Sequence, residues 1–380
     1  MSARSTSARR RLMAELAERR RLLLDRIVLR ARTEVPSYRG LAPAELEPLT
    51  GRMIEIMLDA AVAERGPTAA ELRSFREFGV VRGRQGVSLP EMLTAWRIGV
   101  REILDELTEV GRSSNYSDRL QLELTRQLLD IVDAAILEFS SGHREVELEN
   151  ARQDHRARAD FTRAALTGTA GRAELGVRAQ RYNIEPGHPF IPFRARPTLA
   201  HPLAELERLL GRSGFTTTVD GDLAGFTDRL PDEPPVAVGY AGAVPIDQLT
   251  PGFVQATRAL HTAVAFERTG AYDLAGLGLL PAVLADAEIG DLLVRRYLDP
   301  LRRTDAPELY LDTLRRYLDS GQHIESTARQ LVVHPNTVRY RIDRFQTLTG
   351  TDIRKPAVAL ELWWALQRRR LHEHPIGSDG

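Results

Sequence analysis

The side chains with the clearest chemical purpose lie between His334 and Phe345, in the segment HPNTVRYRIDRF. Val338, Ile342 and Phe345 recur at helical spacing, so a helix over 335–345 would turn these three toward a core. The opposite face then carries four polar side chains: Asn336, Arg339, Tyr340 and Asp343. Asn and Arg form paired hydrogen bonds with the edges of adenine and guanine in the major groove of DNA. The spacing therefore predicts a helix that recognises bases rather than one that makes or breaks bonds.

Hydroxyl and basic side chains border that face. Thr337, Arg341 and Arg344 lie toward its flanks and suit contacts with DNA phosphates. Such contacts set the register of a protein on DNA and carry no sequence information. The alternative is a small helical bundle with a solvated arginine face, because arginine-rich helices recur throughout this chain.

Two earlier helices are expected to hold the recognition helix in place. Each has three apolar residues on one face: Leu311, Leu314 and Leu318 in the first, and Ile324, Ala328 and Leu331 in the second. The first should end at Gly321, because glycine permits a left-handed stop. Val332 and Val333 would form the turn after the second. His334 would cap the third helix and Pro335 would be its first residue, where the missing N–H costs nothing.

Composition limits the remaining possibilities. At about 150 residues per domain, the 380 residues predict two or three domains. The chain has no cysteine, which excludes thiol nucleophiles and thiolate metal sites, and no apolar run of the ~18 residues that a membrane helix needs. Its net charge is +0, so nucleic-acid binding would need a local basic patch; residues 307–371 hold eleven basic and seven acidic side chains. We expect a cytoplasmic protein that does not bind membranes.

Motifs for catalysis and cofactor binding are missing. No GxGxxG opens a helix after a strand, and GxxxxGK[ST], HExxH and GxSxG do not occur. The carboxylates available on a β-hairpin are Asp220, Asp222 and Asp228, and the turn itself explains the first two. We therefore expect no enzyme activity, cofactor or metal, and keep a nucleotide cyclase as an alternative.

Residues 1–166 are expected to form an N-terminal helical domain with a connector helix. The first 33 residues hold ten arginines and three acids with leucines at helical spacing, which predicts one amphipathic basic helix. We interpret its charge as the solvated face of a bundle, with an arm that touches DNA or a membrane surface as the alternative. Start signals near Ser88 and Ser117 predict two further helices, and the second runs into the charged residues 143–160.

The residue composition of the sequence changes near Thr167. Runs at 189–196, 214–219 and 235–242 are rich in β-forming residues, and Asp220-Gly221 is a strong hairpin signal. Helical runs follow at 251–267 and 277–297. We therefore expect an α/β domain over residues 167–300 and a helical C-terminal domain over residues 301–380.

The segment HPNTVRYRIDRFQTLTG, followed by DIRKPAVALELWWAL, resembles the C-terminal helix-turn-helix of the PucR/CdaR family of bacterial transcription regulators. The family pattern His-x-Asn-Thr-x-Arg-Tyr-Arg falls on residues 334–341, and its Thr-Gly turn falls on residues 349–350. The likeness covers about 65 residues. It implies DNA binding through the recognition helix described above.

Two looser likenesses cover the rest of the chain. VAVGYAG, QATRALHTAVAF and the run from AGLGLLPAVL to VRRYLDPL are similar to the degenerate GGDEF-like domain of the same family, and no GGDEF string is present. That likeness implies a cyclase-derived fold without cyclase chemistry. FREFGVVRGRQGVSLPEMLTAWRIGVREIL resembles the helical domain of RsbT co-antagonist proteins, which implies a globin-like arrangement. The first histidine, His143, lies outside the centre of that domain, so a His-ligated haem is not expected.

Together these observations predict a multidomain, mainly α-helical DNA-binding transcription regulator. It would have a globin-like N-terminal bundle, a degenerate GGDEF-like α/β middle domain and a C-terminal helix-turn-helix domain. The expected partners are double-stranded DNA, further copies of the chain in a homodimer or higher oligomer, and a small-molecule effector. A signalling scaffold that binds a partner protein through the N-terminal domain is the alternative. The sequence does not predict the effector, the operator, or whether transcription is activated or repressed.

Overall fold

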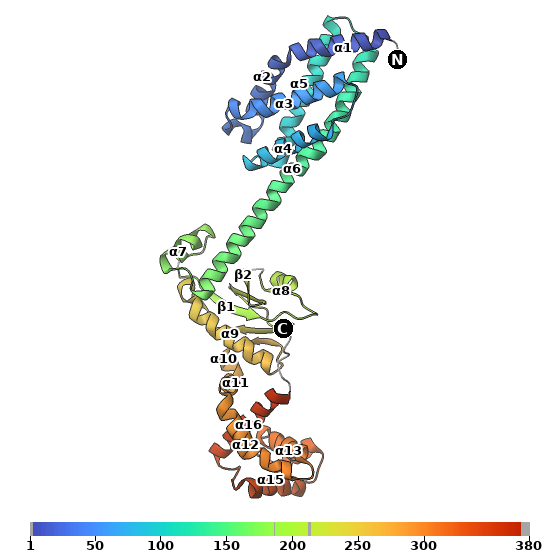
Figure 1. Ribbon diagram of the computed structural model, residues 1–380. Coiled ribbons are helices and arrows are strands. Elements are labelled where there is room, and N and C mark those ends of the chain that lie inside the picture. The colour runs from blue at the N-terminus through green and yellow to red at the C-terminus, as the bar shows by residue number, and fades with distance from the viewer. Residues whose placement is uncertain (1–2, 186, 212–213, 374–380) are drawn as a thin grey trace. The chain divides into compact units, whose positions relative to one another are not determined.

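The computed structural model describes residues 3–185, 187–211 and 214–373, and the chain is mainly helical (Figure 1). It divides into two compact units, residues 1–155 and 156–380. None of the helices in the described part of the chain is long and apolar enough to cross a bilayer.

The first unit is a helical bundle around one apolar core. Its elements are α1 (Ala3–Glu18), α2 (Arg20–Glu34), the 3-10 turn η1 (Pro36–Gly40), α3 (Pro43–Val62), α4 (Ala69–Arg84), α5 (Leu89–Ser113) and the first part of α6 (Asp118–Thr167). The start signals at Ser88 and Ser117 are confirmed, because α5 and α6 begin directly after them. The single basic helix expected for the first 33 residues is instead two, because the backbone leaves helical geometry at Arg19 (φ −86°, ψ 5°).

Three half-exposed arginines at the start of α2 and along it contact buried carboxylates. The carboxylates of Glu102 and Glu106 on α5 are each 5% exposed and pair with three arginines. Arg19 reaches Glu106 at 2.7 Å, Arg30 reaches Glu102 at 2.5 Å, and Arg26 contacts both. These arginines therefore join α2 to α5 through ion pairs while they stay partly exposed to solvent, which adds a structural role to the solvated basic face expected from the sequence.

Glycines let α4 and α6 cross with their backbones in contact. A Cβ atom at Gly79 would lie 1.9 Å from the carbonyl oxygen of Phe139, and one at Gly142 would lie 2.1 Å from the carbonyl oxygen of Arg76. Any side chain at either position would force the two helices apart.

A mixed sheet forms the middle of the chain, as the α/β pattern predicts. Its strands are β1 (Pro189–Ala195), β2 (Gly214–Val219), β3 (Asp222–Thr227), β4 (Ala237–Tyr240), β5 (Val244–Pro245) and β6 (Gly270–Tyr272). The order is β2-β3-β1-β4-β6, with β5 beside β1; β4 and β6 are parallel and the other pairs antiparallel. The hairpin predicted at Asp220-Gly221 is confirmed, because φ is +49° and +82° there and Val219 pairs with Asp222.

Helical segments lie between and beside these strands in sequence. They are α7 (Arg172–Arg181), α8 (Leu203–Leu210), the 3-10 turn η2 (Ile246–Gln248), α9 (Leu249–Ala265), α10 (Leu274–Leu277) and α11 (Leu280–Ala285). The longest of the six, α9, lies against β1 and β4 (Figure 1). Gly239 in β4 permits this approach, since a Cβ there would lie 2.1 Å from the carbonyl oxygen of Ala256 in α9.

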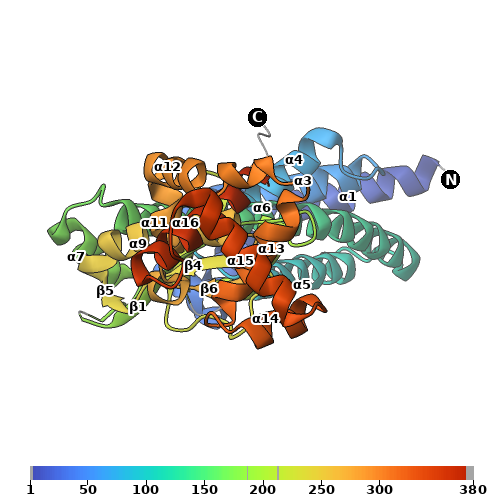
Figure 2. The same ribbon diagram turned by 90° about the horizontal axis from the view of Figure 1, so that it is seen from below.

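The remaining helices share a separate core. They are α12 (Ala287–Tyr297), the 3-10 turn η3 (Asp299–Arg303), α13 (Pro307–Asp319), α14 (Ile324–Leu331), α15 (Pro335–Thr349) and α16 (Pro356–Glu373). Figure 2 shows α13, α14 and α15 beside one another, where they pack in pairs. On α16, Trp363 and Trp364 are half-buried and pack with Phe266 at the end of α9 and with Leu280 and Val283 of α11.

Candidate nucleic-acid interface

Helices α14 and α15 form a helix-turn-helix. The residue after α14, Val332, has left-handed backbone geometry (φ 55°, ψ 46°), and the amide of Val333 donates to the carbonyl of Ala328 at 3.0 Å. This is the hydrogen bond that closes a helix at a left-handed residue. The N-cap of α15 is His334, whose Nδ1 accepts from the amide of Asn336 at 3.2 Å.

The inner face of α15 anchors the helix. Val338 and Phe345 are fully buried and Ile342 is nearly so, as their spacing predicts. They pack with apolar residues of the neighbouring helices, including Leu314 on α13 and Ala328 on α14. Since three turns of α15 are held in this way, the opposite face has a defined orientation.

The outer face of α15 is open to solvent. Five of the seven candidate side chains are exposed: Asn336, Arg339, Tyr340, Asp343 and Arg344. The other two, Thr337 and Arg341, are half-buried on the flanks. The side chain of Tyr340 is 64% exposed, which is unusual for a large aromatic ring.

Arg339 is held by two neighbours. It donates from Nη1 to Oδ1 of Asn336 at 2.8 Å and from Nη2 to Oε1 of Glu325 on α14 at 3.3 Å. The sequence did not indicate Glu325 as a partner of Arg339. The two residues are fourteen positions apart, and no short-range sequence pattern links them. All three side chains are exposed, so the contacts are weak in water and can be exchanged for contacts with a base.

Arg341 and Tyr310 join α15 to α13. Arg341 donates from Nη1 to the buried Oγ1 of Thr313 at 3.0 Å, which fixes the direction of its guanidinium. Burial raises the pKa of Tyr310, and the neighbouring Tyr340 acts in the same direction. Tyr310 is a further member of this surface that periodicity alone did not indicate.

The three middle-domain carboxylates that the sequence offers as candidates for catalysis form ion pairs with basic side chains. Asp222 is 1% exposed and binds Arg194 at 2.8 Å and also Arg196, while Asp220 binds Arg194 at 3.1 Å. Asp228 binds His188 at 2.7 Å. Within the described ranges, no group of His, Asp and Glu side chains is arranged to hold a metal ion. The hairpin acids therefore have structural partners.

Two parts of the sequence match known domain families. Residues 310–367 match the PucR C-terminal helix-turn-helix domain. The C-terminal domain is therefore similar to PucR-type helix-turn-helix domains. Residues 22–158 match the RsbT co-antagonist protein rsbRD N-terminal domain. The likenesses to these two families are therefore confirmed and fit a PucR-type regulator, whereas the GGDEF-like likeness of the middle domain stays a prediction.

Individual relatives match over shorter stretches. An uncharacterized protein of Mycobacterium tuberculosis is 37% identical over 144 residues, which is 37% of this chain and 32% of that protein. The purine catabolism regulatory protein of Bacillus subtilis is 39% identical over 61 residues, which is 16% of this chain and 12% of that protein. The chain thus spans a third or less of the length of these two relatives.

A regulator of polyketide synthase expression from Bifidobacterium adolescentis is a solved structural neighbour. It is 20% identical, and the alignment covers 58% of this chain and 99% of that one with a TM-score of 0.27. A likeness of this size supports no statement about function.

Proposed function

We propose that this chain is a DNA-binding transcription regulator that places α15 in the major groove. The proposal rests on one observation: a capped helix with a fully packed inner face presents Asn336, Arg339 and Tyr340 to solvent. The PucR-type match supports it, and the Bacillus subtilis relative that matches 61 residues of this chain is named as a regulatory protein.

Each candidate side chain has a distinct role in this proposal. Asn336 and Arg339 would bind base edges, with Tyr340 and Asp343 on the same face. Thr337, Arg341 and Arg344 would bind phosphates, and His334 would act only as the helix cap. The amino end of α15 adds a favourable partial charge for phosphate.

The other regions would receive and transmit a signal. The proposed division is a sensing domain over residues 1–166, a middle domain over 167–300 and a DNA-binding domain over 301–380. We assign to the first a globin-like arrangement and to the second a degenerate GGDEF-like fold without enzyme activity. A dimer in the cytoplasm would bind two half-sites about 34 Å apart, or a multiple of that distance.

Binding of the full-length chain to the DNA upstream of its own coding sequence tests this proposal. Arg339→Ala should lower specific affinity by about 5- to 150-fold, which corresponds to the loss of one paired contact with a base, and should relax the sequence preference. The matched control is Arg315→Ala, an exposed arginine on α13 that lies away from α15, beside Trp363 and Arg370 of α16. It should bind as the wild type does.

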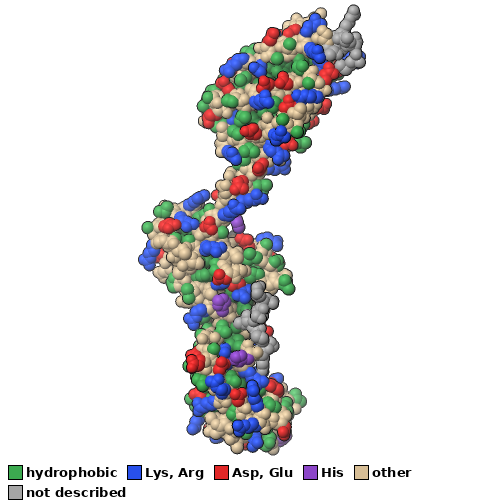
Figure 3. All heavy atoms as spheres, in the orientation of Figure 1, with side chains coloured by type: hydrophobic (Ala, Val, Ile, Leu, Met, Phe, Trp, Pro, Cys, Tyr) green, Lys and Arg blue, Asp and Glu red, His purple; other side chains and the backbone are tan. Residues whose placement is uncertain are grey.

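The salt dependence separates the two kinds of contact. Arg344→Ala should weaken binding to all sequences alike and lower the slope of log affinity against log salt by about one. Figure 3 shows basic and acidic side chains interspersed on the face in view. DNA affinity should therefore depend on a few local contacts rather than on a broad region of positive charge. Equal affinity and equal preference for wild type and Arg339→Ala would refute the proposal.

A further inference from the structure

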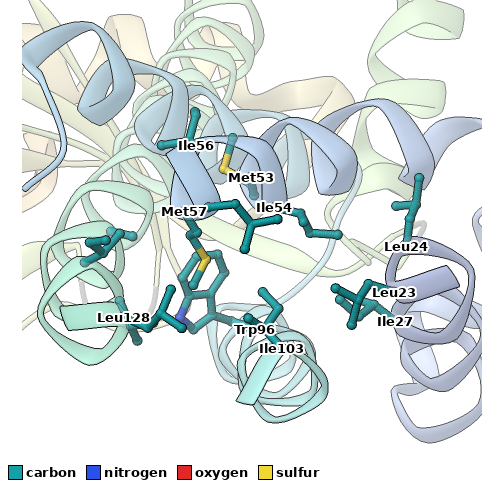
Figure 4. Packing of buried hydrophobic residues seen from close by; sticks show 14 of the residues in the cluster. Leu23, Leu24, Ile27, Met53, Ile54, Ile56, Met57, Trp96, Ile103 and Leu128 are labelled. Carbon is teal, nitrogen blue, oxygen red and sulfur yellow. The ribbon is translucent and has the colours of Figure 1, made fainter. Parts of the chain in front are cut away.

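The N-terminal unit contains an apolar cavity. It has a volume of about 50 Å³ and lies between α2, α3, α4 and α5. Its lining is almost wholly apolar, and includes Ile27, Met53, Met57, Trp96 and Ile103. Figure 4 shows Met57 and Ile103 next to the Trp96 indole. An engineered apolar cavity that binds benzene has a volume of about 150 Å³, so this one suits a shorter group.

A fully buried arginine, Arg82, lies behind two of the aromatic rings that line this cavity and has no counter-ion among the described residues. The guanidinium carbon of Arg82 lies 5.6 Å from the ring centre of Tyr38 and 5.1 Å from that of Phe78, and both rings line the cavity. Arg82 is 0% exposed. Its Nη1 donates to Gln85 at 2.7 Å and to the carbonyl of Glu45 at 3.4 Å, and within the described part of the chain it forms no ion pair. A buried cation without a partner is costly.

Two nitrogen atoms of Arg82 that lack hydrogen-bond partners could together bind a carboxylate. Nε and Nη2 have no hydrogen-bond partner, and these two atoms form one edge of the planar guanidinium. Two parallel N–H groups on one edge match the two oxygens of a carboxylate. The hydroxyl of Tyr38 and the indole Nε1 of Trp96 are also buried without partners.

Burial disfavours the charged form of both Arg82 and Tyr38. It lowers the pKa of Arg82 and raises the pKa of Tyr38 to about 12. In each case the loss of water outweighs the opposing interaction between the two side chains. A bound anion would reverse the effect on Arg82.

We propose that the N-terminal unit binds a short-chain aliphatic carboxylate. Its carboxylate would pair with Nε and Nη2 of Arg82 and accept from the hydroxyl of Tyr38, and its alkyl chain would fill the cavity beside Met57 and Trp96. This inference assigns a ligand to the sensing role proposed above, and its observations include nothing from the DNA-binding domain.

Calorimetric titration of the full-length chain with sodium butyrate, without DNA, tests the site. Saturable binding of one butyrate per chain is expected. Acetate should bind about tenfold more weakly, because it lacks two methylene groups in the cavity. n-Butanol should bind at least about tenfold more weakly, because it lacks the charge.

Two variants locate the binding. Tyr38→Phe keeps the ring and removes one hydrogen bond to the carboxylate, so affinity should fall about tenfold. Gly99→Val fills the cavity from α5 and should abolish binding; a Cβ there meets only Ile27 at 3.7 Å, so the fold should be retained. Circular dichroism checks folding, which matters most for Arg82→Met, the direct but more disruptive change.

Three outcomes would overturn this inference. Absence of saturable butyrate binding would mean that water satisfies Arg82. Equal affinity for butanol and butyrate would remove the role of the cation, and unchanged binding in both Tyr38→Phe and Gly99→Val would place the ligand elsewhere. Since the titration contains no DNA, a failure here leaves the DNA-binding proposal intact, and the reverse also holds.

Discussion

The turn of the helix-turn-helix holds a β-branched residue in a conformation that suits glycine. Val332 has φ 55° and ψ 46°, and its side chain is 90% exposed. Left-handed geometry costs an L-residue roughly 1–2 kcal/mol, because its Cβ approaches the following carbonyl oxygen. The exposed side chain contributes almost no packing to offset this cost.

Val332→Gly should therefore stabilise α14 and α15. Removing the strain should raise the free energy of unfolding by roughly 1–2 kcal/mol. The greater freedom of glycine in the unfolded chain should lower it by roughly 0.5–1 kcal/mol. The net gain is about 1 kcal/mol. Amide hydrogen exchange in the full-length chain measures it locally, and protection of α14 and α15 should rise about fivefold.

Two controls separate strain from side-chain loss. Val332→Ala keeps a Cβ at the same φ and should give a smaller gain. Val254 is an exposed valine inside α9, so Val254→Gly should lower local protection, because glycine is a poor helix former. Unchanged or faster exchange in α14 and α15 of Val332→Gly would refute the strain argument.

Three further predictions concern other parts of the fold. Gly79→Ala should destabilise the N-terminal unit by ~1–3 kcal/mol in urea unfolding, because its Cβ overlaps a backbone carbonyl of α6, whereas Gly176→Ala, with open space around it, should be neutral or slightly stabilising. Hydrogen bonds from Arg65 lower the pKa of Glu71 from 4.5 to about 2. The stability that this adds is therefore complete above pH ~4.5 and is lost as the pH falls toward 2, and Glu71→Gln should flatten the stability profile in that window. Asp222→Asn should cost ~3–5 kcal/mol in the same assay, because buried Arg194 then keeps, among the described residues, only the exposed Asp220 as a counter-ion; a change below 1 kcal/mol would contradict this.

The sequence alone determined the elements whose signals are local. The inward stripe Val338, Ile342 and Phe345 follows from helical periodicity, because a helix repeats every 3.6 residues whatever surrounds it. The β-hairpin follows from Asp220-Gly221, because both turn positions need positive φ. Such features depend on neighbours within a few residues.

Only the tertiary structure decided which distant residues meet. Arg339 and Glu325 come together because the turn brings α14 beside α15. Arg82 meets Tyr38, which lies 44 positions earlier in the chain, because α4 packs next to η1 within the bundle. Gly79 lies inside α4, and the reason that it carries no side chain is visible only with α6 in place. Long-range packing selects these contacts from many that the same residue types permit, and periodicity carries no information about the choice.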